Sequence, residues 1–405
     1  MSIPIQQLPA GKPTPALQPV SRSNWGLTAL PPLALYIHFP WCVRKCPYCD
    51  FNSHEAKGGL DEAGYVEALL RDLEHSLPLF WGRPIHTIFM GGGTPSLFSP
   101  EAMDTLLAGI RARVKLLPDA EITLEANPGT VEADKFKGYR AAGINRLSIG
   151  IQSFNAEHLK AIGRIHDADE ARRAAALAAE TFDTFNLDLM FALPGQSIEQ
   201  ALADVDTALS FAPTHLSCYH LTLEPNTWFY RYPPELPDDD TAASMHDAIE
   251  ARLLAAGFDH YETSAYARPG HRARHNVNYW QFGDYVGIGA GAHGKLSFPD
   301  KVIRQARYKQ PAAYLKAVAE GNAAQIDEAV DLAELPFEFM LNALRLSDGF
   351  PVALFSERTG LPLNTMETAL NEAERLGLIT RDFREIKPTE QGRRYQNQLL
   401  QLFLG

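Results

Sequence analysis

The chain has 405 residues, of which 45% are hydrophobic and 21% are charged, and its formal net charge at pH 7 is −12. Such a chain can bury a large core without disulfides, and no apolar run approaches the ~20 residues of a membrane helix, so general disorder and a membrane span are both disfavoured. The acidic balance also argues against a dedicated nucleic-acid binder, which normally carries a basic surface.

The cysteines are Cys42, Cys46, Cys49 and Cys218, and the first three lie within eight residues. A secreted disulfide-bonded protein spreads its cysteines more evenly. The first 25 residues also lack the apolar segment of a signal peptide. We therefore expect the protein in a reducing compartment, the cytoplasm. We interpret Cys218 as a small buried hydrophobic residue.

Residues 1–32 are rich in proline, glutamine and serine, which predicts a flexible N-terminal tail. From residue 33 onward, short β-rich segments alternate with helical patterns. The predicted strands cover residues 35–38, 86–90, 122–126, 146–149, 186–190 and 216–223. The predicted helices cover residues 60–75, 100–114, 131–142, 168–181 and 198–211. Strands separated by helices in this way predict an α/β fold with parallel strands and crossover helices.

Six such repeats could form an open sheet or an incomplete barrel. We favour a partial (β/α)6, TIM-like barrel over residues 33–300, because residues suited to chemistry cluster just after several strands, where barrel sites lie. Residues 224–300 are less regular. Residues 301–405 are predicted to form a mostly helical C-terminal domain, and its helix, short hairpin, helix order is winged-helix-like. The acidic balance favours a protein-contact or lid role for this domain over DNA binding.

Cys42, Cys46 and Cys49 form a C-x3-C-x2-C motif directly after the first predicted strand. Thiolates suit zinc or iron–sulfur clusters. Zinc usually takes four ligands in two separated pairs, whereas a [4Fe–4S] cluster bound by three thiolates keeps one iron open for another ligand. A zinc site and simple buried thiols are the alternative interpretations.

Other distinctive residues also follow or end predicted strands. Residues 91–95 read Gly-Gly-Gly-Thr-Pro after the second strand, and glycine lets the backbone approach a ligand closely. Glu125 ends the third strand, Gln152 and Arg164 follow the fourth, and Asp188 lies inside the fifth. Charged groups in apolar strands need partners. Each alone would suggest a structural ion pair, but together they predict one shared cavity.

The chain resembles the oxygen-independent coproporphyrinogen-III-oxidase-like branch of the radical S-adenosylmethionine (SAM) superfamily. The resemblance runs from about Leu35 to the C-terminus. The segments that carry it are residues 36–42, 91–97, 125–129, 145–154, 186–190, 223–227 and 275–280. It implies a radical SAM barrel whose [4Fe–4S] cluster is bound by Cys42, Cys46 and Cys49 and whose fourth iron is chelated by SAM.

The resemblance also implies which side chains hold SAM. Tyr36 and Tyr48 match positions that contact it. The residues matching positions that bind one or a second SAM molecule are Gly92, Gly93, Thr94, Glu125, Gln152, Arg164 and Asp188. No catalytic residue is assigned.

Two members of the branch differ at positions visible here. The dehydrogenase that decarboxylates coproporphyrinogen III has a fourth cysteine two residues after the third, and Phe51 stands there in this chain. The heme-chaperone members lack that cysteine and have a His-Asn-x-x-Tyr-Trp segment, present here at residues 275–280. We therefore favour the chaperone. The dehydrogenase and another radical SAM oxidoreductase are the alternatives.

The chaperone interpretation implies that the protein binds heme and transfers it to acceptor proteins, respiratory ones among the candidates. His275 is the expected iron ligand, since imidazole commonly ligates heme iron, and Arg272 or Arg274 could pair with a heme propionate. No nucleic-acid partner is expected. Peripheral membrane contact and a homodimer are left open by the sequence.

Overall fold

A computed structural model describes residues 25–130 and 132–404. Most of the segment expected to be a flexible tail, residues 1–24, lies outside these residues. The rest of that segment is held against distant parts of the chain. Trp25 Nε1 donates a hydrogen bond of 2.7 Å to the carbonyl of Thr359, and the Leu27 amide donates one of 3.0 Å to Pro299 O.

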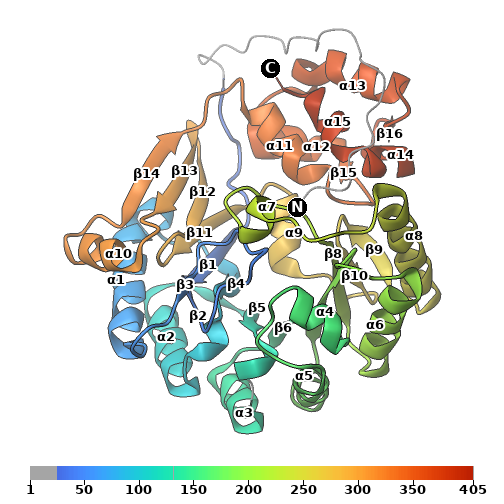
Figure 1. Ribbon diagram of the computed structural model, residues 1–405. Coiled ribbons are helices and arrows are strands. Elements are labelled where there is room, and N and C mark those ends of the chain that lie inside the picture. The colour runs from blue at the N-terminus through green and yellow to red at the C-terminus, as the bar shows by residue number, and fades with distance from the viewer. Residues whose placement is uncertain (1–24, 131, 405) are drawn as a thin grey trace.

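The centre of the fold is a parallel sheet. Its strands, in spatial order, are β11 (Asp284–Ile288), β1 (Leu33–Phe39), β4 (Ile85–Gly92), β5 (Leu116–Ala126), β6 (Arg146–Gln152), β7 (Phe185–Phe191) and β8 (His215–His220). The crossover helices are α1 (Glu62–Phe80), α2 (Pro100–Arg113), α3 (Ala133–Ala142), α5 (Ala168–Thr181) and α6 (Ile198–Ser210). Figure 1 shows these helices in an arc outside the strands. The predicted partial barrel is confirmed.

The amino-acid sequences of these strands and helices explain which of their faces are buried. Strands β1 and β7 read Leu-Ala-Leu-Tyr-Ile-His-Phe and Phe-Asn-Leu-Asp-Leu-Met-Phe and are buried on both faces, as parallel strands covered by helices must be. Helix α5 buries only alanines, so it packs closely on the sheet. Its start is set by a capping box between Asp167 and Glu170.

Antiparallel strands extend the sheet on both sides, giving the order β14-β13-β12-β11 at one end and β8-β10-β9 at the other. The added strands are β9 (Asp259–Glu262), β10 (Ala265–Ala267), β12 (His293–Phe298), β13 (Lys301–Arg307) and β14 (Ala324–Ala329). Because β12 and β13 form a hairpin, the sheet continues across the boundary expected at residue 301. The edge strands β14 and β9 do not pair with each other, so the barrel stays open.

Residues 224–300 are more regular than expected. They contain α7 (Trp228–Arg231), the 17-residue α8 (Asp239–Ala255) and α9 (Arg274–Trp280). The prediction missed α8 because its buried residues, Ala242, Met245, Ile249 and Leu253, form a thin stripe among charged neighbours. Smaller elements are β2 (Trp41–Cys42), β3 (His54–Glu55), α4 (Ala156–Ala161) and the 3-10 turns η2 (Pro95–Leu97) and η3 (Pro128–Thr130).

The C-terminal elements build a second core, which includes Phe339, Phe355 and Leu370 and also takes in Phe282 and Val302 from the barrel side. After α10 (Pro311–Ala319) come α11 (Leu335–Ala343), α12 (Val352–Thr359), η4 (Leu363–Met366), α13 (Glu367–Arg375), α14 (Glu390–Arg394) and α15 (Gln396–Gln401). A small sheet joins β15 (Phe350–Pro351), β17 (Glu385–Pro388) and β16 (Ile379–Arg381). Figure 1 shows this red group at one end of the barrel, near α8 and α9. None of the helices in the described ranges is long and apolar enough to cross a membrane.

Candidate cofactor-binding site

Most residues singled out from the sequence line one cavity of about 240 Å³. They are Cys42, Cys46, Tyr48, Cys49, Gly92, Gly93, Thr94, Glu125, Gln152, Arg164 and Asp188. The cavity lies at the carboxyl ends of the parallel strands, where α/β barrels place their ligands. Phe51 also lines it.

The three cysteines lie on a loop that begins at the end of β2. Their thiols are free and half-buried. The Cys49 amide donates a hydrogen bond of 3.1 Å to Cys46 O, which turns the loop tightly. Burial raises the pKa of Cys42, and it raises the pKa of Cys49 to about 11. The thiols therefore need a metal or a positive charge to exist as thiolates at neutral pH.

Two side chains, one after β4 and one on the loop after α4, approach these thiols. Thr94 Oγ1 lies 3.5 Å from Cys42 Sγ, and Arg164 Nη1 lies 3.6 Å from Cys46 Sγ. Arg164 Nη2 donates a second hydrogen bond, of 2.6 Å, to Gly150 O, which fixes the guanidinium. Both contacts place hydrogen-bond donors against sulfur, where they favour the thiolate.

This donor set fits an iron–sulfur cluster. No three His, Cys, Asp or Glu side chains in the described part of the chain converge as the ligands of a single metal ion do. A [4Fe–4S] cluster makes a different demand, because each thiolate binds a separate iron. Three soft donors around a cavity with a neighbouring cation meet that demand.

The glycines after β4 are required by close packing. Gly92 has φ +107°, and a Cβ there would lie 2.4 Å from His38 Cε1. A Cβ on Gly93 would lie 2.5 Å from Trp41 O. The sequence predicted that glycine here lets the backbone approach a ligand. The structure shows a second reason for glycine, because a larger residue would collide with the end of β1 or with the start of the cysteine loop. The freed Gly92 amide donates to Glu125 Oε2 over 3.1 Å.

Two carboxyl groups lie on neighbouring walls of the cavity. Burial raises the pKa of Glu125 to about 8, and the charge of Asp188 adds to the effect. Burial also raises the pKa of Asp188, although Asn186 Nδ2 and Ser148 Oγ donate to it over 2.8 and 3.2 Å. Paired buried carboxyls of this kind suit a cationic ligand group, which would stabilise their charged forms.

Gln152 ends β6 in the left-handed region, with φ +68°. A residue with a Cβ pays a steric penalty there, and such strain often marks a functional site. The turn directs the chain around the cavity wall beside Arg164. Only the structure could show this strain.

Tyr36 and His275 do not line the cavity. Both rings contact Phe89, which does line it. The Tyr36 and Phe89 rings stack with centroids 6.3 Å apart, and Tyr36 Oη lies 2.9 Å from His38 Nδ1. The His275 ring centroid lies 5.1 Å from that of Phe89. Tyr36 can thus shape the cavity wall through its contact with Phe89.

His275 has both ring nitrogens occupied. Its Nδ1 lies 2.8 Å from Thr87 Oγ1, its Nε2 lies 2.8 Å from Tyr279 Oη, and the residue is 1% exposed. In this conformation no nitrogen is free for iron, which argues against the expected role. The proposed propionate partners form exposed ion pairs, Arg272 with Asp348 and Arg274 with Asp119, and such weak pairs leave both arginines able to bind another carboxylate.

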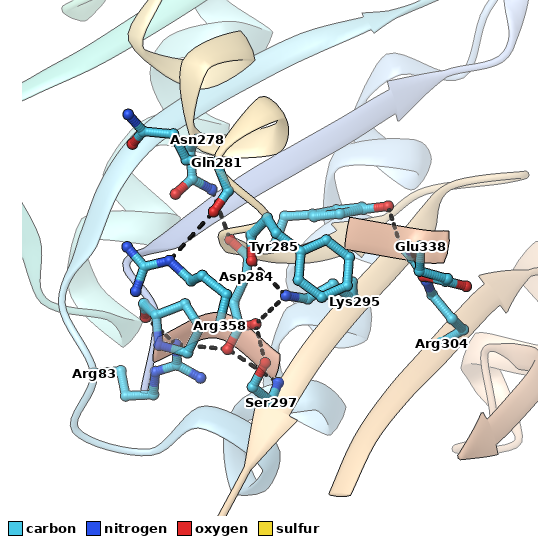
Figure 2. Close-up of polar contacts among 12 residues, drawn as sticks. Arg83, Asn278, Gln281, Asp284, Tyr285, Lys295, Ser297, Arg304, Glu338 and Arg358 are labelled. Carbon is cyan, nitrogen blue, oxygen red and sulfur yellow. Dashed lines mark hydrogen bonds and ion pairs between the residues drawn. The ribbon is translucent and has the colours of Figure 1, made fainter. Parts of the chain in front are cut away.

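The structure also reveals a buried charge cluster that holds α9 and that no motif indicated. Figure 2 shows Asp284 surrounded by Arg83, Lys295 and Ser297. Asp284 is 0% exposed and accepts a hydrogen bond of 2.8 Å from Arg83 and one of 2.7 Å from Ser297 Oγ, while Lys295 Nζ lies 3.1 Å away. A buried carboxylate needs such partners.

The same cluster caps the C-terminal end of α9. Lys295 Nζ donates to Phe282 O over 2.7 Å, and Arg358 Nε of α12 donates to Gln281 O over 3.2 Å. Cations are favourable at a helix C-terminus. Helix α9 is therefore fixed between the barrel and the C-terminal elements, as Figure 2 shows for Arg358 and Gln281.

Comparison with known proteins supports the interpretation of this cavity as a cofactor-binding site. Residues 36–208 match the family model of the Radical SAM superfamily, and residues 330–395 match the HemN C-terminal domain. The solved structure of coproporphyrinogen III oxidase (HemN) from Escherichia coli superimposes with a TM-score of 0.78 at 24% identity, covering 92% of this chain and 90% of that one. The fold and the three-cysteine loop define a radical SAM protein.

Two curated relatives identify the family within the radical SAM superfamily. The heme chaperone HemW of Escherichia coli is 50% identical over 94% of this chain and 100% of its own length. The heme chaperone HemW of Haemophilus influenzae is 47% identical over 93% of this chain and 98% of its own. The chain belongs to the heme chaperone HemW family. Membership of the radical SAM superfamily implies a [4Fe–4S] cluster and SAM.

Proposed function

We propose that this protein is a heme chaperone, which binds heme and transfers it to acceptor proteins while carrying a [4Fe–4S] cluster and SAM. The observation that carries the proposal is the 50% identity to a heme chaperone along 94% of the chain. Identity of this extent spans the barrel, the cysteine loop and the C-terminal elements together.

In this proposal Cys42, Cys46 and Cys49 hold the cluster. When bound, the cluster and SAM supply one-electron chemistry, and the protein supplies their placement and protection. Arg164 offsets the negative charge of the thiolates. The Gly92 amide fixes Glu125, and the Glu125 and Asp188 carboxyls would stabilise a cationic group of SAM.

The alternative function is decarboxylation of coproporphyrinogen III. Phe51 supports the chaperone, because it lines the cavity where the dehydrogenase pattern has a fourth cysteine. Phe51 is 49% exposed, and its phenyl ring cannot act as a metal ligand or a thiol.

The test is anaerobic. The reconstituted protein receives SAM, a reductant and coproporphyrinogen III, with an active dehydrogenase as control, and a parallel sample is titrated with heme. We expect heme binding and no loss of carboxyl groups by mass spectrometry. Loss of two carboxyl groups from the substrate would refute the chaperone assignment. Respiratory acceptors and the cytoplasmic location stay predictions, and peripheral membrane contact and a homodimer stay open.

A further inference from the structure

Arg146 lies at the inner end of the cofactor cavity. Residues 146, 148, 150 and 152 of β6 all line this cavity, because every second residue of a strand faces the same side. Gln152 is the last residue of β6 and Arg146 is the first. Arg146 is therefore the member of this row that lies farthest from the carboxyl ends of the strands and from the cysteine loop. Helix α9 also borders the cavity, through Asn276.

The Arg146 guanidinium is buried without a partner. The residue is 3% exposed, and its Nε is enclosed and has no hydrogen-bond partner. Within residues 25–130 and 132–404, the guanidinium forms neither an ion pair nor a hydrogen bond. Its terminal nitrogens stay open to the cavity. Arginine is charged at every physiological pH, and a buried charge without a partner is strongly unfavourable, so this guanidinium points to an anionic ligand.

The carboxyl groups of the cavity do not fill this role. Glu125 accepts a hydrogen bond of 3.1 Å from the Gly92 amide. Asp188 accepts one of 2.8 Å from Asn186 Nδ2. Burial raises the pKa of both carboxyls, which weakens them as counterions. The positive charge of Arg146 is thus left for a group that enters the cavity from outside.

The chemistry of the guanidinium indicates which anion fits. Its N–H donors form a planar fork that matches the two oxygens of a carboxylate or a phosphate. Neither SAM nor heme contains a phosphate, but SAM has a methionyl carboxylate and heme has two propionates. Arg146 also acts on α9, since burial lowers the pKa of His275 to about 3 and the charge of Arg146 adds to this effect. A carboxylate on Arg146 would lie where the cavity meets α9.

We propose that Arg146 is a carboxylate-binding residue, which holds the carboxylate of a SAM molecule or a propionate of heme at the inner end of the cofactor cavity. The inference deepens the proposed function, and the heme source rests on it. For SAM, Glu125 and Asp188 would take a cationic group and Arg146 the anionic group, so the cavity would orient the ligand by both charges. For heme, the propionate would be held beside α9, the segment that the resemblance links to heme.

The test uses the full-length, cluster-reconstituted protein, without a reductant, and two pairs of ligands that differ in their carboxylates. Equilibrium dialysis compares SAM with decarboxylated SAM, and absorbance titration compares hemin with its dimethyl ester. The proteins are wild type, Arg146→Met, Arg146→Lys and Arg140→Met, a control that removes a surface ion pair with Asp183.

We expect Arg146→Met to weaken the binding of one acid about tenfold to hundredfold and to leave its carboxylate-free analogue unchanged, because charge-assisted hydrogen bonds are lost. Arg146→Lys should recover part of the affinity, since it keeps the charge but not the fork. Ligand-free Arg146→Met should be no less stable than wild type in urea, because it removes a buried unpaired charge. The acid that loses affinity identifies the source of the carboxylate.

Three results would overturn the assignment: unchanged affinity for both acids, equal losses for an acid and its analogue, or a large loss of stability in ligand-free Arg146→Met. The first would leave Arg146 to water or an inorganic anion, and the other two would indicate a structural role. If wild type binds SAM but not hemin, the chaperone proposal falls, while the SAM pair still tests Arg146. If wild type binds neither, both proposals fall. Arg146→Gln replaces Arg146→Met if the latter does not fold.

Discussion

Arg164 Nη1 lies 3.6 Å from Cys46 Sγ, although the two residues are 118 positions apart in the chain. The contact joins the loop after α4 to the cysteine loop after β1. It places a side chain that is charged at every physiological pH beside one of the three proposed cluster ligands. The hydrogen bond to Gly150 O keeps the guanidinium there.

Arg164→Met should make the cluster harder to reduce. Reduction adds negative charge, and a nearby cation stabilises the reduced state. For a charge roughly 6 Å away at an effective dielectric constant of about 20, the loss is on the order of 100 mV. A redox titration followed by electron paramagnetic resonance measures the potential. Arg172→Met is the control, because its guanidinium contacts Asp169 and Phe154 instead of the cysteine loop. Equal potentials in wild type and Arg164→Met would contradict the assigned role.

Cys46→Ser should abolish the absorbance near ~400 nm expected of a thiolate-bound iron–sulfur cluster after anaerobic reconstitution. A hydroxyl is a poor replacement for a soft thiolate ligand. Cys218→Ser is the matched control, because Cys218 is buried on β8 and lies outside the loop. The assignment fails if the Cys46 variant keeps a wild-type chromophore and iron content.

Glu125 should give the cluster-free protein a specific pH dependence. Its pKa is raised from 4.5 to about 8, so the folded state keeps a proton that the unfolded chain releases within this window. The free energy of unfolding therefore falls as the pH rises through it. Between pH 5 and 8, wild type should lose roughly 2–4 kcal/mol more than Glu125→Gln. Urea unfolding at several pH values measures the free energy of unfolding of both proteins. The same pH dependence in wild type and Glu125→Gln would rule out the raised pKa of Glu125.

Lys295→Met should destabilise the fold by about 3 kcal/mol, because it removes one partner of a buried ion pair and leaves Asp284 with less compensation. Lys295 is 1% exposed. Lys316→Met is the control, since Lys316 is 77% exposed and its pair with Glu320 is a surface pair. Its effect should stay within about 0.5 kcal/mol. Denaturant unfolding distinguishes the two, and equal effects would show that the buried cluster does not hold α9.

The parallel part of the fold could be predicted because its signals are local. Helix α5 occupies residues Ala168–Thr181, as predicted, since Asp167 marks its start and alanines form its buried stripe. Strands β1 and β7 are nearly continuous apolar runs. Strand β14 gave no such signal, because its residues are almost all exposed and do not alternate. Strand β11 pairs with β1, about 250 residues earlier in the chain, and local patterns do not encode such pairing.

The residues of the site also fall into those that local patterns could predict and those that needed the structure. Residues at strand ends, such as Glu125 and Asp188, could be grouped because parallel strands bring their carboxyl ends together. His275 could not be judged from its motif, because its partner Thr87 lies on β4, 188 residues away in the chain.

Heme transfer is the most direct test of the chaperone assignment. Full-length protein, loaded with hemin and freed of excess, is mixed with a heme-free apoprotein whose absorbance changes on loading, and free hemin and hemin on serum albumin serve as controls. The account predicts that the acceptor gains heme in step with its loss from this protein. Retention of all heme in the presence of a competent acceptor, or failure to bind it at all, would contradict the account.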